Sequence, residues 1–103
     1  MYEDNLRELE NKIGIKFKNK DLLLQALTHR SYLNENPAWH LDNNERLEFL
    51  GDAVLELVVT EYLYEKYSDP EGELTSWRAA LVNAVMLSKI SEKIDLNNYL
   101  LLS

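Results

Sequence analysis

The stretch from residue 44 to residue 67 constrains the fold most, because it contains no proline and a single glycine. Within it, four carboxylates are spaced 3, 4 and 4 residues apart: Glu45, Glu48, Asp52 and Glu56. On a helix of 3.6 residues per turn they project within a sector of about 80°. Apolar residues cover most of the remaining circumference, and a helix that is apolar nearly all round is typically buried. The sequence therefore predicts one long, buried helix with an acidic stripe.

This acidic stripe, Glu45, Glu48, Asp52 and Glu56, has two interpretations. Carboxylates one turn apart repel each other by a few tenths of a kcal/mol per pair even in water. Burying them costs far more unless a cation neutralises them, which favours a hard divalent metal with oxygen ligands. An exposed polar edge on a half-buried helix would have the same spacing. Periodicity alone does not separate the two.

Composition limits the class of protein. A chain of 103 residues forms one domain with a modest core. The absence of cysteine excludes disulfides and thiolate chemistry and fits a reducing cytoplasm. No apolar run is long enough to cross a membrane. The net charge of −7 is unusual for a nucleic-acid enzyme, although metal-binding carboxylates would inflate the acidic count.

Hydrophobic periodicity predicts an all-α chain. We expect a helix over residues 3–13 ended by Gly14, and a second helix through residue 27 capped by Asn19 or Asp21. A loop over residues 31–43, the long helix, a turn over residues 68–72 and a fourth helix to about residue 94 follow. The short last segment ends in an apolar run over residues 99–102, which we expect to be unshielded.

The string Asn-Glu-Arg-Leu-Glu-Phe-Leu-Gly-Asp-Ala-Val-Leu at residues 44–55 closely resembles the signature of the ribonuclease III endonuclease domain. Residues 27–32, 71–75 and 78–83 fit the same family in the same order. The resemblance implies the helical fold of that domain. In the family, a later helix supplies an Asp and a Glu that complete the metal site. Residues 1–103 are therefore expected to be the N-terminal portion of the domain, truncated on the C-terminal side and without a double-stranded-RNA-binding domain.

The resemblance also assigns roles to individual residues. Glu48 and Asp52 match the catalytic acids that bind Mg²⁺, for which Mn²⁺ can substitute. Asn44, Glu45 and Glu71 match positions that contact substrate or support the site. Two of these have a simpler alternative: Asn44 is a good helix N-cap, and an acidic residue beside glycine is common in any turn.

Gly51 lies in the middle of the long helix, where glycine costs about 0.5–1 kcal/mol relative to alanine. This cost suggests that another helix approaches closely, most simply the same helix of a second subunit. Phe49 and Leu50 would lie beside it in the dimer interface.

Two other polar residues receive no catalytic role. His29 lies in a segment that matches the family as a structural element, in which Ser31 can cap or brace the adjacent loop. Glu56 has no counterpart in the signature, and we interpret it as part of a polar edge.

The leading functional hypothesis is a metal-dependent endoribonuclease that cleaves double-stranded RNA, including ribosomal RNA precursors, as a homodimer. By resemblance it leaves 5′-phosphate and 3′-hydroxyl ends, and this chain alone is expected to be inactive. One alternative is a non-catalytic RNA-binding module of the same fold, which typically lacks the acids. Another is a plain dimerisation module, which leaves the acidic stripe unexplained.

Overall fold

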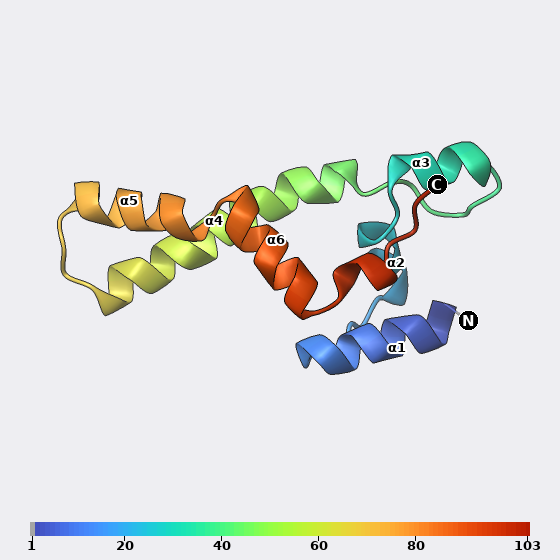
Figure 1. The fold of residues 1–103 in the computed structure, drawn as a ribbon, viewed down its shortest axis with the longest axis horizontal. Coiled ribbons are helices and arrows are strands. Elements are labelled where there is room, and N and C mark those ends of the chain that lie inside the picture. Colours follow the sequence, from blue (N-terminus) through green and yellow to red (C-terminus); the bar gives the residue numbers. More distant parts are fainter. Residues whose placement is uncertain (1) are drawn as a thin grey trace.

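The computed structural model describes residues 2–103, and helices make up most of this part of the chain (Figure 1). The elements are α1 (Tyr2–Ile13), α2 (Lys20–Ala26), α3 (Arg30–Glu35), α4 (Glu45–Lys66), α5 (Glu71–Leu81), α6 (Ala84–Lys93) and the short 3₁₀ helix η1 (Leu96–Asn98). Between residues 2 and 103 the only strand-like pairing is a single bridge between Thr28 and Leu101. The predicted all-α class is confirmed.

The molecule is elongated, with principal extents of 51 × 27 × 23 Å. In Figure 1, α1, α2 and the end of the chain gather at one end, whereas α4 extends away and α5 folds back along it. The hydrophobic core lies at the end of the molecule that contains α1 and α2. It is formed by Leu6, Leu9, Leu23, Leu24, Leu27 and Tyr99. We call this the α1–α2 core.

The first two helices follow the sequence prediction closely. Leu6 and Leu9 are buried on one face of α1, and Gly14 ends that helix with a positive φ of 74°. Of the two candidate caps for α2, Asn19 is the residue that acts. Its Oδ1 accepts hydrogen bonds from the backbone N–H groups of Asp21 at 3.0 Å and Leu22 at 3.3 Å.

The predicted loop over residues 31–43 is wrong in its first part, where α3 forms. His29 caps this helix, because its Nδ1 accepts the backbone N–H of Ser31 at 3.1 Å. Histidine is an uncommon cap, so its presence gave no helix signal in the sequence. His29 thus has the structural role that the sequence suggested, whereas Ser31 itself does not cap the helix.

The predicted fourth helix is interrupted at Asn83, which separates α5 from α6. The Oδ1 of Asn83 accepts the N–H of Met86 at 3.0 Å, and its Nδ2 donates to the carbonyls of Ala80 at 2.8 Å and Ala79 at 3.2 Å. One amide therefore satisfies backbone groups at both helix ends, which makes the break favourable.

The turn before α5 is shorter than predicted. Pro70 is the N-cap residue, with φ −61° and ψ 156°, and the helix begins at Glu71. Gly72 is therefore part of the helix. Glu71 and Glu73 lie in the first turn, where negative charge interacts favourably with the helix dipole.

The expectation that α4 is buried is also wrong, because Leu63 is its only buried residue. The helix α5 covers just the second half of α4: Arg78 Nη1 donates to Thr60 Oγ1 at 3.0 Å, and the Tyr67 and Trp77 ring centroids lie 4.9 Å apart. The first half is mostly exposed in the described residues, and Phe49 is 83% exposed.

The apolar run over residues 99–102 is better shielded than predicted. Tyr99 is buried in the α1–α2 core, and its hydroxyl donates to Glu8 Oε1 at 2.6 Å. Leu100 and Leu101 pack against the same core. The N–H of Leu101 also donates to the carbonyl of Leu27 at 2.8 Å, which holds this segment beside the end of α2. Only Leu102 remains substantially exposed in this run.

Candidate functional site

The start of α4 is fastened to the end of α2 by Asn44. The Asn44 backbone N–H donates to the Thr28 carbonyl at 2.9 Å, and Asn44 Nδ2 donates to the Ala26 carbonyl at 3.0 Å. The interpretation of Asn44 as a side-chain N-cap is wrong, because its amide is engaged with α2. Asn43 satisfies the free helix N–H instead, since its Oδ1 accepts from Glu45 N at 3.0 Å.

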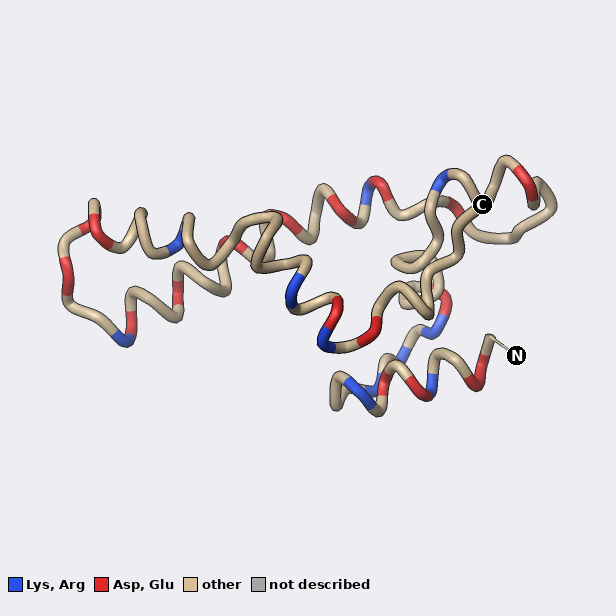
Figure 2. Tube along the Cα trace, in the orientation of Figure 1, with Lys and Arg blue, Asp and Glu red and all other residues tan. Residues whose placement is uncertain are grey.

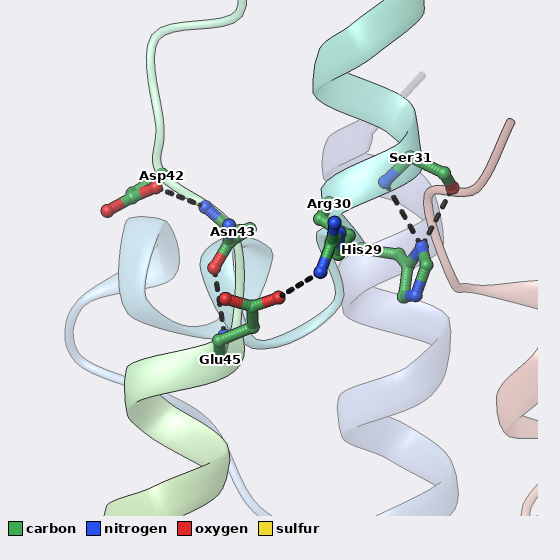
Figure 3. Close-up of polar contacts among 6 residues, drawn as sticks. All are labelled: His29, Arg30, Ser31, Asp42, Asn43 and Glu45. Atoms are coloured by element: carbon green, nitrogen blue, oxygen red, sulfur yellow. Dashed lines mark hydrogen bonds and ion pairs between the residues drawn. The ribbon is translucent and has the colours of Figure 1, made fainter.

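The first carboxylate of the acidic stripe is paired with a residue of α3. Arg30 Nη1 donates to Glu45 Oε1 at 3.4 Å (Figure 3). The same end of α3 also holds the last residue of the chain, because Ser31 Oγ accepts the N–H of Ser103 at 3.0 Å. Sequence reasoning missed the Arg30 contact, which spans 15 positions and depends on a helix that was not predicted.

Glu48 and Asp52 lie one helical turn apart on an exposed face of α4. Figure 2 shows acidic residues following one another along this helix. Within residues 2–103, Glu45 is the only member of the acidic stripe that forms an ion pair. Glu48, Asp52 and Glu56 are therefore available to a ligand from outside.

The donor chemistry of Glu48 and Asp52 fits a hard divalent cation, which prefers carboxylate oxygens. The number of donors is small, however: nowhere in the described chain do three or more His, Asp or Glu residues converge in an arrangement that could hold a metal ion. Residues 2–103 thus bring together one pair of carboxylates and leave most of a coordination shell to other groups.

Glu71 does not join this pair. It begins α5, and the connection between α4 and α5 lies at the opposite end of α4 from α3 (Figure 1). From Glu48 to the end of α4 is about 27 Å along the helix axis. Glu71 instead lines an open cleft of about 760 Å³ between α4 and α5.

Residues 49–58 of α4 expose a broad apolar face. Its members are Phe49, Leu50, Val54, Leu57 and Val58, each more than half exposed. A Cβ built at Gly51 would meet no heavy atom within 4 Å, so nothing in the described chain requires glycine there. We call this surface the α4 apolar face.

Comparison with known proteins establishes the class. Residues 19–103 match the family model described as Ribonuclease-III-like, and the chain belongs to this family. Ribonuclease 3 of Natranaerobius thermophilus is 58% identical over 94 residues, which are 90% of this chain and 40% of that protein. Ribonuclease 3 of Enterococcus faecalis is 52% identical, over 92% of this chain and 42% of its own length. The chain thus spans about two fifths of these relatives.

A solved structure supports the same conclusion. The nuclease domain of ribonuclease III from Campylobacter jejuni superposes with a TM-score of 0.82 at 48% identity, over 93% of this chain and 64% of that chain. The predicted family and fold are therefore confirmed.

Among the helices between residues 2 and 103, none is both long and apolar enough to span a membrane.

Proposed function

We propose that this chain contributes the first half of the active site of a metal-dependent endoribonuclease acting on double-stranded RNA. The observation that carries the proposal is the pair Glu48 and Asp52, exposed one turn apart on α4 within the family signature and without ion-pair partners in residues 2–103. Cleavage leaves 5′-phosphate and 3′-hydroxyl ends with short 3′ overhangs. The protein acts in the cytoplasm, which its lack of cysteine fits.

Glu48 and Asp52 would hold Mg²⁺, or Mn²⁺ in its place. When bound, such an ion activates water and stabilises the charge that develops on the phosphoryl group. Mg²⁺ needs near-octahedral coordination, so groups from outside residues 1–103 complete the shell.

The functional unit is a homodimer in which each subunit cuts one strand. The α4 apolar face supports this part of the proposal, because contiguous exposed apolar surface marks interaction sites. Gly51 lies within that face and lets a second helix approach closely. Phe49 and Leu50 pack beside it. In the C. jejuni relative, a region of the nuclease domain is involved in dimer formation.

Asn44, Glu45 and Glu71 contact the substrate or support the site. Glu71, at the start of α5, acts across the dimer towards the RNA bound at the partner. The duplex is read through its shape, its backbone and its 2′-hydroxyls. With a net charge of −7, this part of the protein binds RNA weakly, and other parts supply most of the affinity.

The test is a cleavage assay with long double-stranded RNA and the full-length protein, in which Mg²⁺ is titrated and the product ends are analysed. The proposal expects no cleavage in EDTA and products with 5′-phosphates when Mg²⁺ is added. A non-catalytic RNA-binding module would bind the RNA and leave it intact at every Mg²⁺ concentration. A dimerisation module would neither bind nor cleave it.

A further inference from the structure

Arg30 is the one cation that residues 2–103 place in contact with the acidic stripe of α4, through its pairing with Glu45 at 3.4 Å. We infer that Arg30 is a substrate-positioning residue, whose guanidinium binds a phosphate of the RNA backbone next to the Glu48–Asp52 pair. The inference rests on the proposed function, since it concerns the RNA bound at that same site.

The pairing with Glu45 leaves Arg30 available for a ligand. The Arg30 and Glu45 side chains are 70% and 54% exposed, and exposed ion pairs contribute little to stability. The contact is a single long hydrogen bond, although a guanidinium carries five N–H donors in a planar fork. That fork matches the oxygens of a phosphate in a bidentate arrangement. A phosphate can therefore replace the Glu45 carboxylate as the hydrogen-bond partner of Arg30 at little cost in stability.

The backbone that carries Arg30 is fixed relative to α4. His29 caps α3 immediately before Arg30 (Figure 3). Ser31 Oγ also accepts the N–H of Ser103 at 3.0 Å. Asn44, the residue before α4, donates to two carbonyls at the end of α2. Only the long side chain of Arg30 needs to move when RNA binds, so the phosphate it holds has a defined place beside the stripe.

Charge explains why a cation is needed at this place. A phosphate that approaches α4 meets four carboxylates on a chain of net charge −7. Glu45 precedes Glu48 by about 4.5 Å along the helix axis, so Arg30 lies at the edge of the proposed metal site. A purely electrostatic role, in which Arg30 only neutralises Glu45, is the competing explanation, and a double-mutant comparison distinguishes it from phosphate binding.

The experiment uses the full-length protein carrying Glu48→Ala, so that bound RNA stays intact, and a short RNA duplex measured by fluorescence anisotropy at several salt concentrations. Arg30→Ala should weaken binding about tenfold, because a charged hydrogen bond is lost. It should also lower the salt slope by about one, the value for one phosphate contact. Arg30→Lys should restore part of the affinity, since lysine keeps the charge without the fork.

Arg7→Ala is the matched control, because Arg7 is also 70% exposed and pairs with a carboxylate, Asp4, but lies on α1. It should leave the affinity and the salt slope unchanged. The second arm repeats Arg30→Ala and Arg30→Gln in a Glu45→Gln background. If Arg30 binds a phosphate, each Arg30 substitution lowers the RNA affinity by the same factor whether Glu45 is present or replaced by Gln. Circular dichroism and the thermal midpoint show whether each variant is folded, and Arg30→Gln replaces the charge while keeping a long polar side chain.

Three results would overturn the inference: unchanged binding by Arg30→Ala, a loss that disappears in the Glu45→Gln background, or an equal loss for Arg7→Ala. These outcomes are distinct from failure of the proposed function. If Glu48→Ala abolishes cleavage while Arg30→Ala binds RNA normally, the proposed nuclease function is supported and the proposed role of Arg30 is contradicted. If Glu48→Ala cleaves at the wild-type rate, the proposed site itself is wrong.

Discussion

Carboxylates on α1 and α4 differ in burial and in their partners within the chain. Glu10 is 5% exposed, and its Oε2 accepts hydrogen bonds from Phe17 N at 2.6 Å and Lys20 Nζ at 2.5 Å. Glu48 and Asp52 are exposed and form no ion pair within residues 2–103. A buried charge must be neutralised by the fold itself, whereas stacked exposed acids persist at a cost unless something external binds them. Glu10 therefore stabilises the fold, and the α4 pair is left for a ligand.

Apolar residues show the same contrast. In the α1–α2 core, Leu9 is 2% exposed, whereas Phe49 and Leu57 on α4 are 83% and 65% exposed. The apolar content of α4 resembles that of a buried helix, yet the described chain buries only Leu63 of it. The first half of α4 thus has both acids and apolar side chains directed outward, which is the surface expected of a site completed by other groups.

The largest effect is expected for the carboxylates of the α4 pair. Glu48→Ala or Asp52→Ala in the full-length protein should lower the rate of RNA cleavage by about 10²–10³-fold or more, because a metal ligand is lost. The fold and the RNA affinity should be largely kept, since both side chains are exposed. Glu56→Ala, on the same stripe but outside the signature, should cleave within a few-fold of wild type. Equal losses in all three variants, measured at low Mg²⁺, would contradict the assignment.

A polypeptide of residues 1–103 should not cleave double-stranded RNA. Two carboxylates make a poor Mg²⁺ site, and residues 2–103 offer no third ligand. The measurement is a cleavage assay with Mg²⁺ or Mn²⁺ and nuclease-free protein, with Glu48→Ala as the control. Metal-dependent products with 5′-phosphates that disappear in this control would show that the α4 pair suffices by itself.

The contrast between apolar residues is tested by two identical substitutions. Leu9→Ala should lower the free energy of unfolding by about 2–5 kcal/mol, because a filled core position becomes a cavity. Leu57→Ala should change it by less than about 0.5 kcal/mol at concentrations where the protein is monomeric. Denaturant unfolding measures both. A large loss for Leu57→Ala in the monomer would show that the α4 apolar face is covered within one chain.

The sequence predicts what local periodicity determines. The bounds of α1 and α4 and the end of α1 at Gly14 follow from helical spacing and glycine chemistry. The break at Asn83 and the cap at His29 were missed, because an amide or imidazole bonds to the backbone only in a particular local geometry. Burial of α4 was mispredicted, since an apolar sequence shows that a surface needs a partner without showing which molecule supplies it.

In the candidate site, too, some features could be predicted from the sequence and others could not. The spacing predicts the acidic stripe, and the resemblance to the family signature singles out Glu48 and Asp52, both of which are exposed on α4. The pairing of Arg30 with Glu45 could not be predicted, because it requires α3 and the attachment of Asn44 to α2. Contacts between segments distant in sequence are invisible to periodicity.

Self-association is tested at Gly51. Gly51→Leu should raise the dimer dissociation constant about tenfold or more, because the added side chain prevents close helix approach. Gly72→Leu is the matched control, since Gly72 is also a helical glycine with no heavy atom within 4 Å of a built Cβ. Sedimentation of the two variants and the wild type gives the comparison. A wild-type protein that remains monomeric at high micromolar concentration would count against the dimer, and an unchanged Gly51→Leu dimer would place its interface elsewhere.

The smallest effect concerns the paired carboxylate of α1. The hydrogen bond from the Lys20 ammonium, and then that from the Phe17 backbone, hold the pKa of Glu10 below its usual value of 4.5. A lowered pKa in the folded state means that this contribution to stability is fully present above about pH 4.5. It is lost as the pH falls below 4.5 and through the pKa of the folded state. Glu10→Gln should therefore flatten the acid side of the stability curve between pH 5 and 3, measured by thermal unfolding at about one-unit intervals. A Glu10→Gln curve that stays as steep as the wild-type curve would show that Glu10 is not the structural carboxylate that its contacts indicate.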